Sequence, residues 1–317
     1  MTLQLPWQPL WYHGHSKRRN FFEGWYFKWI SPDEQHAFAI IPGIAKEPDG
    51  QQHAFIQVMD GKAKTAQYHR FEAEAFQAST DAFEVQIEGN FFSADRVVLD
   101  LPELKGEVYM QNLTPWPWKW YAPGIMGPFS FVPMMQCYHG VVSMDHSLHG
   151  ELQYQGNAID MHGGRGYGEK DWGRSFPSSW IWMQTNHFEE PGISLSASVA
   201  MIPWLHTSFV GFIAGLWVKD RLYRFATYTG AKLVDVRVED GNVYYALADR
   251  TKRLQIVAHH AAGTDLRSPV KGLMEGRVNE SMEARIDVQL FEKGQLIFEG
   301  TGRNAGLEVA GEVEELM

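Results

Sequence analysis

Apolar and polar residues alternate with a period of two along almost the whole chain of 317 residues. The cleanest case is 282–290, where every second residue is apolar and the residues between are charged or amide side chains. Such alternation is typical of a strand with one buried face. Gly294 and Asp240-Gly241 supply turn signals, and no segment carries a capped helical pattern over three turns. The sequence therefore predicts an all-β fold of antiparallel sandwiches or barrels.

Gly150 and the polar segment 151–157 lie near the middle of the chain. Each half contains enough predicted strands for its own barrel-like unit. We therefore expect an N-terminal β-barrel-like lobe over 1–150 and a C-terminal β-barrel-like lobe over 151–317, the second carrying the sequence Glu-Lys-Asp-Trp.

Residues 113–136 break the alternation, because five prolines are interspersed with tryptophan, tyrosine and phenylalanine. Proline is excluded from central strands, so this segment is predicted to be a long irregular loop. Its aromatic side chains would pack either on the protein's own core or at the mouth of a ligand site.

Composition excludes several classes of function. A net charge of −10 argues against nucleic acid as a partner and against strong attachment to anionic lipid. No run of 18 apolar residues or signal-peptide pattern is present. Cys137 is the single cysteine, so neither an internal disulfide nor a cysteine-rich zinc site is expected. We expect a cytoplasmic protein with at most peripheral membrane contact.

The segment 165–182 sets two carboxylates, Glu169 and Asp171, among aromatic residues. If 165–172 is a strand, these two side chains share a face and Lys170 points to the other. A carboxyl group against aromatic walls tends to keep its proton, and indole faces stabilise cations. The pattern suits protonation of an apolar molecule. The alternative is an ordinary sheet whose carboxylates pair with Lys170 or Arg174.

Other chemistries are weaker. His139, His146 and His149 lie close in sequence but lack the spacing of a helical zinc motif. The glycines at 163–166 lead into a strand, whereas a phosphate-binding loop would lead into a helix. Cys137 and His139 would point in parallel, which is poor geometry for a nucleophile and its base. We therefore predict no metal and no cofactor.

Four blocks carry a resemblance to a known family. Gly-Gly-Arg-Gly-Tyr-Gly-Glu-Lys-Asp-Trp-Gly at 163–173, continued by Phe-Pro-Ser-Ser-Trp-Ile-Trp, is similar to tocopherol cyclase and its bacterial relatives. Phe-Glu-Gly-Trp-Tyr-Phe-Lys at 22–28, the segment 137–146 and Asn-Ala-Gly-Leu-Glu-Val at 304–309 resemble further blocks of that family. The resemblance implies a doubled lipocalin-like fold enclosing an apolar cavity, in a wider group that includes carotenoid hydratases.

The resemblance also implies roles for individual residues. Glu169 matches the family's glutamate and would donate a proton, with Asp171 orienting it or sharing that proton. Glu308 and Glu23 are further acid candidates; Glu23 either lies in the pocket, which the resemblance favours, or pairs with Arg18 or Arg19. The candidate substrate-binding residues are Trp25, Tyr26, Tyr167, Trp172, Trp180, Trp182, Asn186 and His187.

The activity implied is acid-initiated cyclisation of a prenylated phenol or quinol to a chromanol-type ring. A dry site would be needed, because an alkene is a poor base. The partner would be an apolar prenylated or isoprenoid small molecule, and an isomerisation requires no cofactor. The alternatives are an isoprenoid or carotenoid hydratase and a non-catalytic lipocalin-like binder of an apolar molecule.

Overall fold

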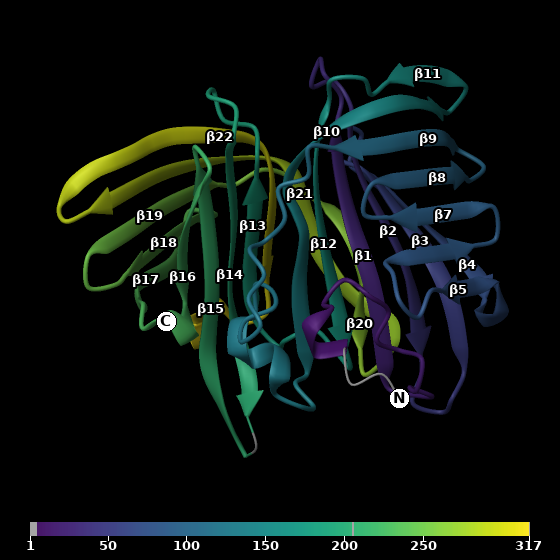
Figure 1. Cartoon of the computed structure of the whole chain (residues 1–317), viewed down its shortest axis with the longest axis horizontal. Helices are drawn as coiled ribbons and strands as arrows, with labels where there is room; N and C mark the ends of the chain where they lie inside the picture. Colours follow the sequence, from purple (N-terminus) through teal and green to yellow (C-terminus); the bar gives the residue numbers. More distant parts are fainter. Residues whose placement is uncertain (1–4, 205, 317) are drawn as a thin grey trace. The chain divides into compact units, whose positions relative to one another are not determined.

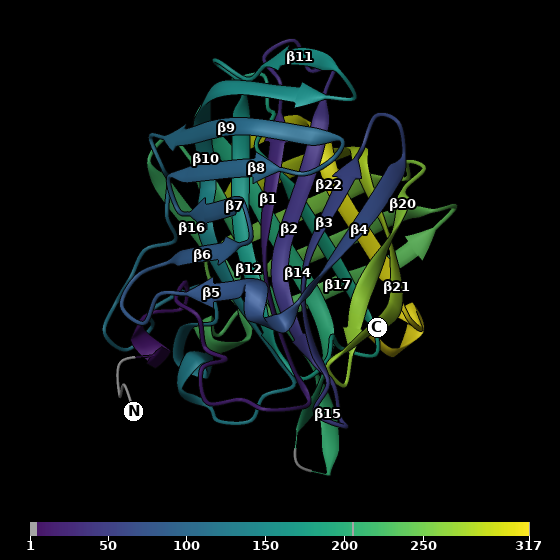
Figure 2. The same ribbon diagram turned by 90° about the vertical axis from the view of Figure 1, so that its right-hand side faces the viewer.

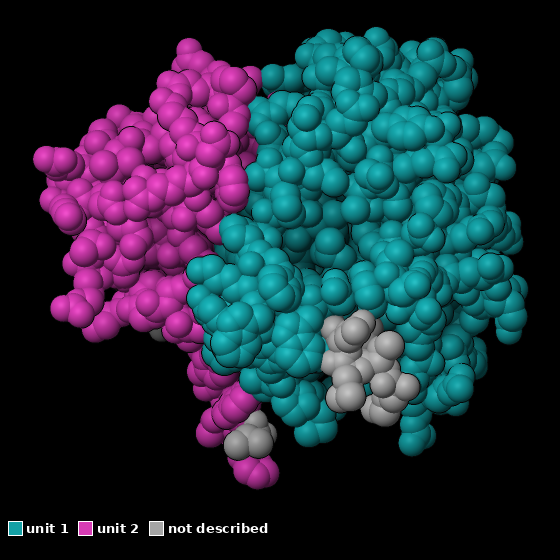
Figure 3. Space-filling view, viewed as in Figure 1, with its two compact units in different colours: residues 1–176, 266–277 teal, residues 177–265, 278–317 magenta. Residues whose placement is uncertain are grey.

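The computed structural model describes residues 5–204 and 206–316, and these contain β-strands and short 3-10 turns but no α-helix. The all-β expectation is confirmed. The strands divide into two antiparallel sheets. The chain forms two compact units, one made of 1–176 and 266–277 and the other of 177–265 and 278–317 (Figure 3).

The sheet of the first unit is built around β1, β12 and β10, three strands from distant parts of the sequence (Figure 1). Its strand order is β4 (Thr65–Glu72), β3 (Gln52–Asp60), β2 (Ala37–Lys46), β1 (Phe21–Ile30), β12 (Arg165–Gly173), β10 (Cys137–Tyr154), β9 (Leu104–Gln111), β8 (Arg96–Asp100), β7 (Asn90–Ser93), β6 (Glu84–Ile87) and β5 (Phe76–Ala78), with β11 (Asn157–Asp160) paired to β10.

This sheet folds over onto itself. Figure 2 shows β5 to β9 crossing β1 to β4, and the apolar cluster between them joins Trp25, Phe27 and Trp29 to Phe83 and Phe92. The crossing begins at the 3-10 turn η2 (Ala73–Ala75), which separates β4 from β5. Because these two end strands are not paired to each other, the sheet is open and does not close into a barrel.

The second sheet, most of which lies in the second unit, is likewise open and carries its own apolar core. Its strand order is β16 (Arg221–Ala226), β15 (Thr207–Val218), β14 (Ile193–Trp204), β13 (Trp180–Thr185), β22 (Gln295–Ala310), β21 (Leu273–Glu292), β19 (Lys252–His259), β18 (Asn242–Ala248) and β17 (Lys232–Glu239), with β20 (Thr264–Val270) paired to β21.

The predicted turns are present. Asp240 and Gly241 both have positive φ and join β17 to β18, as the Asp-Gly signal predicts for a tight hairpin. Gly294, also at positive φ, joins β21 to β22. The remaining 3-10 turns are η1 (Leu5–Trp7), η3 (Gly127–Phe131), η4 (Thr227–Thr229) and η5 (Val313–Leu316).

The boundary between the units differs from the expected one. Position 150 falls inside β10, a continuous strand, and β12 belongs to the first sheet. The Glu-Lys-Asp-Trp sequence therefore lies in the first unit rather than in a C-terminal lobe. The first unit also includes 266–277, whose turn at Lys271-Gly272 lies against Lys46; a Cβ on Gly272 would come within 2.3 Å of the Lys46 carbonyl oxygen.

Candidate functional site

Strand β12 carries the acidic sequence between two neighbours that complete a polar group. In the antiparallel register Glu169 lies opposite Tyr26 of β1, and Asp171 lies opposite His139 of β10. Residues opposite each other in such a ladder share a face. The predicted alternation is confirmed: Glu169 and Asp171 share one face, and Lys170 lies on the other.

The imidazole of His139 lies between the two carboxylates. Its Nδ1 is 3.0 Å from Asp171 Oδ1, and its Nε2 is 3.7 Å from Glu169 Oε2. The hydroxyl of Tyr167 donates a hydrogen bond of 2.6 Å to the same Glu169 oxygen. Glu169 and Tyr167 are buried. We call these four residues the acidic group.

The two carboxylates of the acidic group favour a positive charge on His139. Burial alone would lower the pKa of this imidazole, but the negative charges of Asp171 and Glu169 outweigh that effect and raise the pKa to about 9. The same surroundings raise the pKa of the nearby Cys137 thiol, through burial first and then the two carboxylates. A proton is thus held on His139 at neutral pH, and Cys137 stays a thiol rather than a nucleophilic thiolate.

His139, Glu169 and Asp171 offer ligand atoms that lie within 4.8 Å of one another, close enough for a metal ion. Imidazole binds a metal ion in its neutral form, so a metal ion here would have to displace the proton that the two carboxylates favour on His139. The other histidines considered lie elsewhere. His146 lies against Gly166, and His149 contacts His162.

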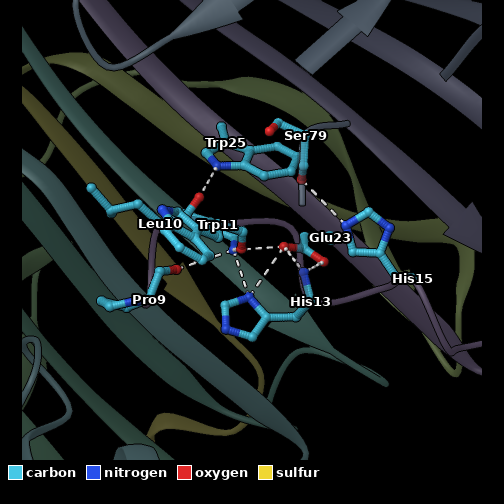
Figure 4. A network of polar contacts seen from close by, with 9 residues as sticks. Pro9, Leu10, Trp11, His13, His15, Glu23, Trp25 and Ser79 are labelled. Atoms are coloured by element: carbon cyan, nitrogen blue, oxygen red, sulfur yellow. Dashed lines mark hydrogen bonds and ion pairs between the residues drawn. The ribbon is translucent and has the colours of Figure 1, made fainter. Parts of the chain in front are cut away.

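The opposite face of β12 carries a buried ion pair between Lys170 and Glu23, and Figure 4 shows Glu23 beside His13 of the N-terminal segment. Lys170 Nζ lies 2.5 Å from Glu23 Oε1, and both side chains are fully buried. The ammonium group also donates to the carbonyl oxygens of Pro9 and Trp11, and the backbone N–H of His13 donates to both Glu23 oxygens at 2.9 Å. These contacts anchor the N-terminal segment to the sheet.

Charges in this pair compensate each other. Burial would raise the pKa of Glu23, but Lys170 and His13 outweigh it and hold the pKa below its ordinary value. Burial lowers the pKa of Lys170 to about 8, against the opposing effect of Glu23. Both groups therefore remain ionised at neutral pH. Glu23 pairs with Lys170, and not with Arg18 or Arg19 as considered from the sequence.

Two of the candidate tryptophans lie with this ion pair in the core of the first sheet. Trp25 is fully buried, and its indole N–H donates to the Leu10 carbonyl at 3.1 Å. Trp172 stacks on the imidazole ring of His13, and Lys170 Nζ lies 4.4 Å from the centre of the Trp172 ring. Of the candidate aromatics in this unit, only Tyr26 and Tyr167 share a face with Glu169.

The remaining candidates belong to the second unit. Trp180 and Trp182 lie on the face of β13 opposite the core residues Ile181 and Met183, and Trp180 Nε1 donates to Glu308 Oε2 at 2.7 Å. Glu308 lies opposite Trp182 on β13 in the register. Asn186 and His187 follow β13 and are buried. The distance from His187 Nδ1 to Asn186 Oδ1 is 2.8 Å.

Sequence reasoning missed three residues of these groups. It considered His139 only as a metal ligand or as the base for Cys137, although its place in the block 137–146 was a usable signal. For Lys170 it predicted the face of the strand but not the buried partner, Glu23. Glu280, buried opposite Glu308 on β21, was not considered at all.

Comparison with known proteins settles the family. Residues 107–311 match the family model described as tocopherol cyclase-like. The chain belongs to the tocopherol cyclase-like family. It is 27% identical over 176 aligned residues to the chloroplastic tocopherol cyclase of Zea mays, and the match covers 51% of this chain and 36% of that protein.

A probable chloroplastic tocopherol cyclase of Oryza sativa subsp. japonica is 25% identical over 175 residues, covering 51% of this chain and 37% of that protein. The chain thus spans little more than a third of the length of the curated relatives it matches.

Solved structures with the same arrangement confirm the fold. A putative AttH from Nitrosomonas europaea has a TM-score of 0.52 at 15% identity, with 94% of each chain covered. CghA bound to Sch210972 has a TM-score of 0.56 at 12% identity, covering 92% of this chain and 89% of the other. The two-sheet, lipocalin-like architecture expected from the resemblance is therefore present.

The His139 charge leads to a titration prediction. Its pKa is raised from 6.5 to about 9 in the folded chain, so the bound proton stabilises the fold below about pH 6.5, and this contribution is lost as pH rises through about 9. The full contribution is on the order of 3 kcal/mol. Titration of the His139 ring resonances by NMR should give an apparent pKa near 9.

The matched control is His139→Gln, whose free energy of unfolding should change less between pH 7 and pH 10 than that of the parent. A His139 resonance that titrates near its ordinary value would contradict the arrangement, because it would mean that the carboxylates do not hold the proton.

Proposed function

We propose that this protein catalyses acid-initiated cyclisation of a prenylated phenol or quinol to a chromanol-type ring. The observation that carries the proposal is the acidic group, in which two carboxylates hold a proton on His139 beside the buried Glu169. Membership of the tocopherol cyclase-like family supports the same reaction type. Side chains whose pKa is strongly shifted by burial and by neighbouring charges are common at sites of proton transfer.

The proton balance of the reaction can be followed through the group. His139 passes its proton to Glu169, whose carboxyl group then protonates the alkene of the prenyl chain. A tertiary carbocation forms, and the phenolic oxygen attacks it to close the ring. The phenolic proton returns to His139, assisted by Asp171. Nothing is consumed besides the substrate, so the step is an isomerisation without a cofactor.

Aromatic side chains would stabilise the cation and bind the apolar chain. Tyr26 and Tyr167 share the face of Glu169, and electron-rich ring faces attract a developing positive charge. On the second unit taken by itself, Trp180, Trp182, Asn186 and His187 are proposed substrate-binding residues, and Glu308 is a further candidate acid. Glu23, Trp25 and Trp172, by contrast, pack with Lys170 in the core.

A product assay tests the proposal. Purified protein is incubated with prenylated hydroquinones in deuterium oxide, and the extract is analysed by mass spectrometry. We expect a chromanol-type product of the substrate's composition carrying one non-exchangeable deuterium, because the proton added to the alkene ends on carbon.

The other outcomes identify the alternatives. A product heavier by one water would make the protein a hydratase using the same acid step. A substrate that binds and is recovered unchanged would make it a lipocalin-like binding protein. Boiled protein and Glu169→Gln serve as controls for non-enzymatic ring closure.

A further inference from the structure

Exposed aromatic side chains gather on the first unit, outside the acidic group. Trp118, Trp120 and Tyr121 are 57%, 71% and 47% exposed, and Trp7 and Phe131 are each 37% exposed. Large apolar side chains with this much exposure are uncommon when they occur together, and such groups mark interaction sites. We call these five residues the aromatic patch.

Specific contacts hold the patch together. The indole N–H of Trp7 donates to the Trp120 carbonyl at 2.8 Å, and the indole N–H of Trp118 donates to the Trp7 carbonyl at 3.1 Å. The rings of Trp7 and Phe131 lie 5.0 Å apart. The N-terminal turn η1 and the segment 113–136 are therefore joined at the patch.

The tip of the patch is a tight turn. Lys119 and Ala122 exchange two backbone hydrogen bonds of 3.1 and 2.9 Å, and Trp120 and Tyr121 are the two residues between them. The two rings meet edge to face at 5.5 Å. A turn closed by paired hydrogen bonds presents these rings to the outside in a fixed arrangement.

The two sequence segments that form the patch contain no acidic residues, which is unusual for this chain. The sequence holds 38 acidic residues, yet none lies between Glu107 and Asp145, and Lys119 is the one lysine or arginine in that stretch. The first acidic residue of the chain is Glu23, and exposed Lys17, Arg18 and Arg19 precede it. Both segments that form the patch are thus neutral to basic in a protein of net charge −10.

We propose that the aromatic patch binds the interface of a lipid bilayer. Tryptophan and tyrosine are the residues that favour the boundary between headgroups and acyl chains, since their rings are apolar and carry a polar group. The two segments that form the patch are free of acidic residues and weakly basic, which matches the negative surface of a membrane. No helix within the described residues is long and apolar enough to cross a bilayer, so contact through this patch would be peripheral.

Vesicle sedimentation tests the proposal without any substrate. The whole chain is mixed with vesicles of phosphatidylcholine alone or with added phosphatidylglycerol, and the bound fraction is measured. We expect binding to both, tighter to the anionic vesicles at low salt. The double variant Trp120→Ser/Tyr121→Ser should bind about tenfold more weakly or worse, because it loses two inserted rings.

The matched control is Trp204→Ser, which removes a tryptophan that is 40% exposed in the second unit. This variant should bind vesicles as the parent does, and all proteins should keep the parent's circular dichroism and thermal midpoint. Binding that falls equally in both variants would overturn the proposal, as would a parent protein that ignores both vesicle types.

A second copy of the chain is the competing occupant. Sedimentation equilibrium of the parent and of Trp120→Ser/Tyr121→Ser decides this point. A parent dimer that becomes a monomer in the variant would assign the patch to self-association and overturn membrane docking. If the parent and the variant have the same oligomeric state in solution, the result supports membrane docking.

Discussion

Replacing Glu169 with glutamine should lower turnover by about 10²–10⁴-fold, the range expected for loss of a general acid. Glutamine keeps the size of the side chain and can still accept the hydrogen bond from Tyr167 at 2.6 Å, but it carries no transferable proton. Substrate affinity should change by less than tenfold. The measurement is the initial rate of product formation per folded molecule, together with a binding titration.

Asp171→Asn is the companion variant. It removes one of the two charges that raise the pKa of His139, so the proton is held less tightly. The parent's rate should decline as pH rises through about 9, since His139 then loses its proton, and in Asp171→Asn that decline should move to lower pH. The loss of turnover should be milder than for Glu169→Gln.

A different result would assign Glu169 to stability alone. If Glu169→Gln lowers the thermal midpoint while the rate per folded molecule stays normal, the carboxylate only supports the sheet. Measuring both quantities on the same preparation separates the two roles.

Replacing Lys170 with methionine should destabilise the protein by about 3–5 kcal/mol, because Glu23 would be left as a buried charge without its cation. Glu23 is fully buried 2.5 Å from the ammonium group, so water cannot compensate for the loss. Two backbone carbonyls of the N-terminal segment, those of Pro9 and Trp11, would also lose their donor. Denaturant unfolding followed by circular dichroism measures the change.

The double variant Glu23→Gln/Lys170→Met is the control. With both charges removed, most of the stability should return, since a neutral buried pair avoids the desolvation cost of two ions. A Lys170→Met protein that loses less than about 1 kcal/mol would show that the pair is solvated in solution, as exposed ion pairs are.

Local patterns predicted much of the fold. The alternation of 165–172 correctly separated Glu169 and Asp171 from Lys170, because side-chain direction in a strand depends only on parity. Asp240-Gly241 identified a hairpin from the backbone preferences of two adjacent residues. The irregular loop at 113–136 followed from the chemistry of proline.

The errors have a common cause in long-range pairing. The boundary at 150 was wrong because a polar segment can lie at the end of a long strand, as 151–154 does in β10. Lys170 meets the Trp11 carbonyl across 159 residues of sequence, and no local pattern encodes such a register. His139 acquires its pKa only when β10 pairs with β12, so its part in the acidic group depends on tertiary structure.

The position of Lys170 between Glu169 and Asp171 links the start of the chain to the chemistry. Side chains alternate along β12, so Glu169 and Asp171 point to the acidic group and Lys170 points to the contacts that anchor the N-terminal segment. Shortening or displacing residues 9–13 would therefore act on the acidic group through the strand itself. Under the proposed function, a chain whose first segment has not docked would hold Glu169 less firmly, so docking of residues 9–13 and competence for acid catalysis would be gained together.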